Sequence, residues 1–110
     1  MDNLIIYQKI YDFTLYLFPI VDRFPKFEKF VICTMLKTCV LGMAKGVIRA
    51  NKSRNKKPLL YDIDVQLEEL KFLLRLSHDR KYLSHRSYEQ SSKLTAEIGR
   101  LLGGWIKSTG

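Results

Sequence analysis

The stretch GVIRANKSRNKKPLLYD, residues 46–62, lies between two long segments with helical apolar spacing and decides how they are connected. Its middle part, NKSRNKKP at residues 51–58, has the composition of a loop, and Pro58 allows a new helix to begin after it. Helices joined by such a short connection pack as antiparallel neighbours. The stretch therefore predicts a helical hairpin with a basic turn.

Apolar spacing on both sides of this turn predicts four helices. They cover about residues 3–23, 26–52 and 60–80, and a fourth runs from Ser84 to about residue 107. Because the connections are short, we expect the 110 residues to form a single all-α domain, an antiparallel up-down-up-down four-helix bundle. The predicted inward residues are Cys33, Leu36, Val40, Met43 and Val47 in the second helix, Ile63, Leu67, Leu70 and Leu74 in the third, and Tyr88, Leu94, Ile98, Leu101 and Trp105 in the fourth.

The first predicted helix is apolar nearly all round, since Leu4, Tyr11 and Leu15 do not share one stripe with its other apolar residues. Such a helix must bury more than one face, which favours self-association, although a bend at Pro19 would also spread its surface over two neighbours. Its most apolar run, residues 10–21, is expected to be too short to span a bilayer and is interrupted by an aspartate and a proline. The first residues also lack the basic region of a signal peptide. We therefore expect a cytoplasmic protein with no membrane partner.

Two glycines, Gly42 and Gly46, lie four residues apart inside the second predicted helix. Each costs about 1 kcal/mol relative to alanine in a helix interior. Close backbone contact with another helix would offset this cost. The alternative is a weak helix that the packed bundle tolerates.

Basic residues are concentrated in one third of the chain, which has a net charge of +8. Residues 29–61 contain eight lysines and arginines and no acid, whereas the remaining residues carry eleven of each sign. This asymmetry attracts polyanions such as nucleic acid or an anionic membrane surface; the alternative is a solvated lysine-rich face that serves solubility. Only Tyr61 lies near enough for base stacking, so we expect phosphate contacts without sequence readout. The candidate phosphate-binding residues are Lys45, Arg49, Lys52, Arg54, Lys56 and Lys57.

Charges on the last two predicted helices are more mixed. Four acids crowd the expected first turns of the third helix, where the positive end of the helix dipole stabilises carboxylates. They are Asp62, Asp64, Glu68 and Glu69. Further along, Lys71 and Arg75 form a like-charge pair four residues apart, whose weak repulsion a bound anion or solvent would relieve. In the fourth helix Arg100 belongs to an outer basic stripe, and Glu97 is expected to pair with it.

Neither a catalytic site nor a metal or cofactor site is predicted. His78 and His85 are the only histidines, and no nucleophile stands beside either with a third orienting group. Cys33 and Cys39 point away from each other on one helix, so no disulfide is expected. Their spacing to the histidines matches no structural zinc pattern, and the paired glycines near residue 104 lack the context of a phosphate-binding loop. We do not expect an enzyme.

Three stretches resemble a known family of four-helix bundles. They are LYLFPIVDRFPKFEKF at residues 15–30, LEELKFLLRLSHDRKYLS at 67–84 and AEIGRLLGGWIK at 96–107. The family includes the accessory variability determinant (Avd) of diversity-generating retroelements and the protein encoded by intervening sequences in bacterial 23S ribosomal RNA genes. The last stretch is closer to the Avd branch.

This resemblance implies a cytoplasmic homopentamer that binds RNA and DNA and also binds the reverse transcriptase of the retroelement, without polymerase chemistry of its own. Carried over by position, it adds Lys71 and Arg75, and we add Arg100, to the candidate nucleic-acid or polymerase surface. Two alternatives stay open: a protein of the ribosomal intervening-sequence type, and a structural module that binds an acidic protein partner.

Overall fold

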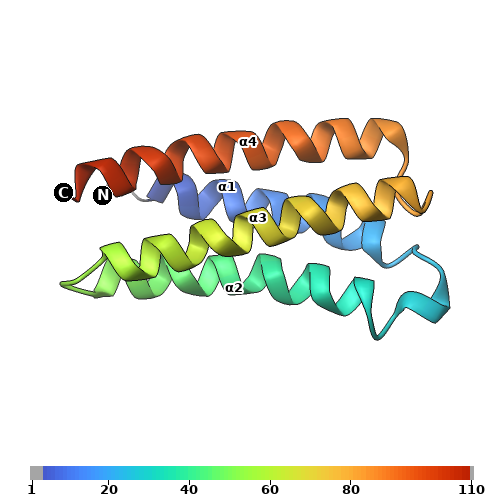
Figure 1. The fold of residues 1–110 in the computed structure, drawn as a ribbon, viewed down its shortest axis with the longest axis horizontal. Coiled ribbons are helices and arrows are strands. Elements are labelled where there is room, and N and C mark those ends of the chain that lie inside the picture. Colours follow the sequence, from blue (N-terminus) through green and yellow to red (C-terminus); the bar gives the residue numbers. More distant parts are fainter. Residues whose placement is uncertain (1–3, 110) are drawn as a thin grey trace.

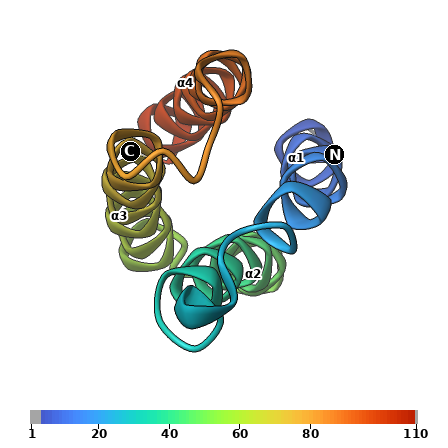
Figure 2. The same cartoon turned by 90° about the vertical axis from the view of Figure 1, so that its right-hand side faces the viewer.

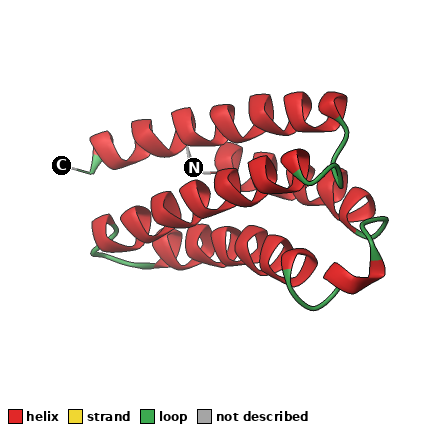
Figure 3. Cartoon of the chain, turned by 45° about the vertical axis from the view of Figure 1, so that its right-hand side comes forward, coloured by secondary structure: helices red, strands yellow, loops and turns green. Residues whose placement is uncertain are grey.

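The computed structural model describes residues 4–109, which form four α-helices and one short 3-10 helix and contain no strand. The helices are α1 (Leu4–Val21), α2 (Ile32–Lys52), α3 (Lys57–Asp79) and α4 (His85–Ser108), and the 3-10 helix η1 covers Lys26–Glu28 (Figures 1 and 3). The predicted all-α class with four helices is confirmed.

Each helix runs antiparallel to the next along an elongated bundle of 42 × 24 × 20 Å (Figure 1). Viewed along the bundle, α1 contacts α2 and α4, and α3 contacts the same two helices, so α1 and α3 lie on opposite corners (Figure 2). The beginning of α1, the α2–α3 loop and the end of α4 share one end of the bundle (Figure 1). The α3–α4 turn and η1 lie at the other end.

The core contains one buried stripe from each helix, and burial of each large side chain stabilises the fold by about 1.5–3 kcal/mol. All nine predicted inward residues of α2 and α3 are buried. The prediction for α4 is partly wrong, because Tyr88, Leu94 and Leu101 are only half buried. The buried stripe of α4 runs instead through Ser91, Thr95, Ile98, Leu102 and Trp105.

The prediction that the second helix begins near Lys26 is wrong, because α2 begins only at Ile32. After Pro25 the chain makes the single 3-10 turn of η1, in which the Glu28 amide donates to the Pro25 carbonyl at 2.9 Å. Val31 then leaves the helical region with φ −118° and ψ −91°. The apolar pattern across this segment therefore belongs to two elements and a break between them.

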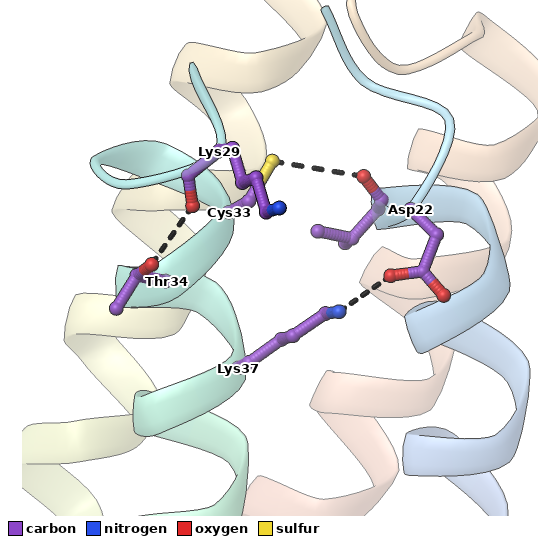
Figure 4. Close-up of polar contacts among 6 residues, drawn as sticks. Asp22, Lys29, Cys33, Thr34 and Lys37 are labelled. Atoms are coloured by element: carbon purple, nitrogen blue, oxygen red, sulfur yellow. Dashed lines mark hydrogen bonds and ion pairs between the residues drawn. The ribbon is translucent and has the colours of Figure 1, made fainter. Parts of the chain in front are cut away.

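Polar contacts fix the beginning of α2 against the end of α1 (Figure 4). The Cys33 thiol donates to the Val21 carbonyl at 3.6 Å, and Lys37 forms an ion pair with Asp22. These contacts join the residues just before the loop to those just after it, so the loop is fixed although it contains no long helix.

At the same end of the bundle, Tyr82 ties η1 to the α3–α4 turn. Its hydroxyl donates to Glu28 Oε2 at 2.8 Å and accepts from the Arg80 guanidinium at 3.2 Å. The hydrogen bond from Arg80 to Tyr82 raises the pKa of the guanidinium. The Tyr82 ring also packs against Phe24 and Phe27, with centroids 5.6 and 6.1 Å apart. The contacts of Tyr82 with Phe24, Phe27 and Glu28 are long-range and are not visible in the sequence pattern.

The glycines of α2 allow α3 to approach closely. A Cβ built on Gly46 would lie 2.6 Å from Ile63 Cγ1, and a Cβ on Gly42 would lie 2.8 Å from Gln66 Nε2. Close contact with another helix therefore explains Gly46, whereas Gly42 faces the flexible end of the Gln66 side chain.

The loop between α2 and α3 is shorter than predicted, because α3 begins at Lys57 rather than near residue 60, whereas α2 ends at Lys52 as predicted. Pro58 occupies the second position of α3, where a missing amide hydrogen costs nothing. The early start leaves the first turn of α3 without an acid, so the helix-dipole explanation for Asp62 and its neighbours is wrong.

By length and composition alone the whole of α1, Leu4–Val21, could cross a membrane, although the expectation from the sequence considered only its most apolar run, residues 10–21. This is weak evidence for a membrane location, because core helices of soluble proteins satisfy the same criterion. In the bundle α1 buries Ile6, Ile10, Phe13, Leu17 and Val21 against α2 and α4. Its opposite side leaves Leu4, Tyr11 and Leu15 more than half exposed.

Candidate nucleic-acid interface

Three candidate residues, Lys45, Arg49 and Lys52, lie on the outward face of α2 and are exposed. Helical spacing places them on this face because the buried stripe of α2 occupies the opposite side. Arg49 and Lys52 belong to the last turn of the helix, where cations complement the negative end of the dipole. None of the three lies within ion-pair distance of a carboxylate in residues 4–109.

One acidic residue, Asp62, nevertheless lies near the outward face of α2. Lys45 and Arg49 line a shallow hollow of about 230 Å³ between α2 and α3, and Asp62 lines it too. Asp62 therefore reduces the positive electrostatic potential near the middle of α2 without forming a short ion pair. The positive charge is least neutralised toward the C-terminal end of the helix.

The α2–α3 loop continues the basic surface around the end of the bundle. Arg54 and Lys57 are exposed and line a hollow of about 700 Å³ whose opposite wall is the last part of α4, including Gly104 and Trp105. Sequence reasoning missed this wall, because only the folded bundle brings the end of α4 beside the loop. Lys107, exposed in the last turn of α4, adds another cation at this end.

Lys56 has a different role from the other loop cations. It is half buried, and its Nζ donates to the carbonyls of Ala50 and Ser53 at 2.8 Å each. These contacts add a charged donor to the carbonyl groups at the C-terminal end of α2, where the Ala50 carbonyl also accepts from the Ser53 amide at 3.3 Å. Of the six cations predicted around this turn, Lys56 is therefore the least available to an external phosphate.

The remaining candidates lie on α3 and α4, and two of them have carboxylate neighbours. Lys71 Nζ is 3.2 Å from Glu68 Oε2, and Arg75 Nε is 3.8 Å from Asp79 Oδ2. Arg100 is exposed on α4, the helix diagonally opposite α2 (Figure 2). The structure therefore does not bring Arg100 together with the candidates on α2.

The predicted pairing of Glu97 with Arg100 is wrong. Glu97 Oε1 is 2.9 Å from Lys9 Nζ, so this carboxylate joins α4 to α1. Arg100 is left without an ion pair in the described part of the chain.

Both cysteines are free and buried, Cys33 against α1 and Cys39 against α3. Burial raises the pKa of the Cys33 thiol, and it raises the pKa of Cys39 to about 11. Thiols held in the neutral form are poor nucleophiles. Within residues 4–109, no three or more His, Cys, Asp or Glu side chains come together as a metal site.

The class that these features define is an antiparallel four-helix bundle with a cationic face along α2 and around the adjacent loop. The chain belongs to the bAvd-like family, whose model matches residues 4–109. The resemblance recognised in the sequence is thereby confirmed.

A solved structure shares the fold. It is the crystal structure of a protein of unknown function from the S23 ribosomal protein family of Bacteroides thetaiotaomicron VPI-5482, with a TM-score of 0.87. The similarity covers 97% of this chain and 99% of that one at 18% sequence identity. A search of the curated proteins found no match.

Proposed function

We propose that this protein is the nucleic-acid-binding accessory protein of a diversity-generating retroelement. In this role it binds the reverse transcriptase together with RNA and DNA during mutagenic retrohoming in the cytoplasm. Membership of the bAvd-like family supports the retroelement role. The observation that carries nucleic-acid binding is the set of exposed cations from α2 into the loop, none of which forms an ion pair with a carboxylate in residues 4–109.

Binding proceeds through phosphate contacts that release condensed counterions. The residues proposed to make them are Lys45, Arg49, Lys52, Arg54 and Lys57. If one chain engages about five duplex phosphates, the logarithm of the binding constant falls against the logarithm of salt concentration with a slope of about −4.5. The absence of an exposed aromatic within the loop fits recognition of shape and charge.

We also propose that the protein works as a homopentamer. A closed ring is built by joining one face of each subunit to a different face of the next. Two apolar faces suit this arrangement: one on α1, with Tyr11 and Leu15, and one on α3, with Val65 and Phe72. They lie on diagonally opposite helices (Figure 2). Sedimentation at the mass of a single subunit would refute the ring.

Lys71 and Arg75 are proposed to face the reverse transcriptase or the nucleic acid held beside it. Each already has a carboxylate within 4 Å, so a partner must offer groups that replace or join these local pairs. Co-purification of the polymerase with a Lys71→Glu, Arg75→Glu variant tests this assignment. Retention equal to that of the parent chain would remove both residues from the interface.

The central experiment is filter binding of a structured RNA across a salt series with two matched variants. One carries glutamate at Arg49, Lys52 and Arg54 at the basic end. The control carries glutamate at Arg23, Lys26 and Lys29, which are exposed at the other end of the bundle (Figure 1). Both lose the same net charge.

We expect the first variant to lose most of its affinity and to show a shallower salt slope, while the control retains the slope of the parent. Equal losses in both variants would mean that only overall charge matters. Parent binding that does not respond to salt would contradict the phosphate mechanism.

The position of the gene separates the retroelement role from the alternatives. A neighbouring reverse transcriptase gene with template and variable repeats supports the retroelement role, and a location inside a ribosomal RNA gene opposes it.

A further inference from the structure

The two histidines of the chain meet at the turn between α3 and α4, at the right-hand end of Figure 1. His78 lies in the last turn of α3 and His85 is the first residue of α4. Their rings are 5.5 Å apart between centroids, and His78 Nε2 lies 3.5 Å from His85 Nδ1. A separation of seven residues matches no zinc pattern in sequence, so only the fold reveals this pair.

The backbone of the turn fixes the relative positions of the two residues. The Tyr82 amide donates to the Ser77 carbonyl and the Lys81 amide to the His78 carbonyl, each at 2.9 Å, with Lys81 at a positive φ of 65°. This is the Schellman arrangement that ends many helices. Ser84 then begins α4 by accepting a hydrogen bond from the Ser87 amide at 3.1 Å.

The His78 ring is also held by an aromatic neighbour. It stacks on Tyr88 with centroids 4.5 Å apart and planes inclined by 17°. Tyr88 lies in the first turn of α4, so this stacking joins the His78 ring of α3 to α4. This contact orients the imidazole toward His85 before any ligand arrives.

A carboxylate lies on the outer side of each imidazole. Asp79 Oδ1 is 3.4 Å from His78 Nδ1, and Glu89 Oε2 is 4.0 Å from His85 Nε2. Asp79 lies close enough to Nδ1 of His78 to favour a proton there, which leaves the lone pair on Nε2, the usual arrangement for a histidine ligand of a metal. The two inner nitrogens, Nε2 of His78 and Nδ1 of His85, are 3.5 Å apart, so one can donate a hydrogen bond to the other, and a bound metal takes the place of that proton.

We propose that His78 and His85 form a binding site for a divalent transition metal, with zinc or copper as the best fit. Nitrogen ligands lie about 2.0–2.1 Å from zinc, which at a tetrahedral angle places two of them about 3.3–3.4 Å apart. The observed 3.5 Å is within a few tenths of an ångström of that spacing. Imidazole selects zinc, copper and nickel over magnesium and calcium.

The site uses two protein ligands, because no third His, Cys, Asp or Glu joins them in the described part of the chain. Water completes the coordination, so the metal exchanges readily. A metal bound here links α3 to α4 and holds closed the turn that contacts η1 through Tyr82. The site is separate from the basic α2–α3 loop, which lies at the other end of the bundle (Figure 1).

The test is calorimetric titration and thermal unfolding of the untagged protein, first stripped with a chelator. Zinc chloride is added, and magnesium chloride is the comparison. We expect zinc to bind once per chain and to raise the unfolding temperature, and magnesium to do neither. His78→Ala and His85→Ala should each abolish the zinc-dependent rise. His85 is exposed, so its variant keeps the fold, and the exposed neighbour Arg86→Ala should respond to zinc like the parent.

Zinc binding of equal strength in the parent and in His85→Ala would overturn the proposal, and so would the absence of zinc binding by the parent at millimolar zinc. A variant with both cysteines replaced by alanine must still bind zinc. If it does not, the thiols rather than the imidazoles are the ligands and the proposal fails.

Discussion

Replacing Gly46 by alanine tests how closely α2 and α3 pack. The added Cβ would lie 2.6 Å from Cγ1 and 3.1 Å from Cδ1 of Ile63, whereas carbon atoms in contact prefer about 3.5–4.0 Å. Ile63 is fully buried and branches at Cβ, so it cannot move aside without disturbing the core. Overpacking of this kind costs about 1–3 kcal/mol, and the better helix propensity of alanine returns about 0.8–1.0 kcal/mol. We expect Gly46→Ala to lower the free energy of unfolding by up to about 2 kcal/mol.

The matched control is Gly103→Ala in α4, where a Cβ meets nothing within 4 Å. Alanine restricts the unfolded chain more than glycine does, so this variant should be more stable than the parent by about 0.4–1 kcal/mol. Gly42→Ala gives an intermediate case, because its Cβ would meet only the flexible end of Gln66. Urea unfolding of the three variants measures the differences directly. If Gly46→Ala stabilises the protein as much as Gly103→Ala does, the close contact between α2 and α3 is not real.

Four further predictions concern single residues. Lys81→Gly should raise the free energy of unfolding by about 1 kcal/mol, measured by urea unfolding, because glycine adopts the positive φ of 65° at this position without strain. Ser91→Ala should also stabilise by about 1 kcal/mol in thermal unfolding, because the buried Ser91 Oγ has no hydrogen-bond partner among the described residues. Lys56→Ala should cost about 1 kcal/mol by losing its two bonds to backbone carbonyls, whereas Arg54→Ala should leave stability unchanged. The Cys39 thiol has a pKa raised from 9.0 to about 11, so the unfolded chain loses this proton first and stability should fall between about pH 9 and 11, less steeply in Cys39→Ala.

Apolar spacing predicts a helix core well where large aliphatic residues form it. In α2 and α3, Leu36, Val47 and Leu67 recur at helical spacing and all are buried. In α4 the same approach fails in part, because the buried stripe passes through Ser91 and Thr95. The Thr95 hydroxyl donates to the Ser91 carbonyl at 2.9 Å, so its polar group is satisfied within the helix and it can enter the core. Hydropathy alone does not identify such residues.

The candidate site was harder to predict than the fold, because charge partners are chosen by tertiary contacts. Spacing along one helix suggests Arg100 as the partner of Glu97, but the folded bundle supplies Lys9 from another helix. Likewise, composition places Lys56 among free loop cations, whereas the tight turn directs its ammonium group to backbone carbonyls. The break at Val31 was hidden because exposed apolar residues around it continue the helical pattern.

Because the bundle has an even number of antiparallel helices, the beginning of α1 and the end of α4 lie at the same end of the bundle as the basic α2–α3 loop (Figure 1). This geometry has a practical consequence for any laboratory handle. A polyhistidine tag attached after α4 would lie next to the cationic hollow, and its imidazoles would compete for transition metals. Fluorophores and purification handles for quantitative work are better removed by cleavage before measurement.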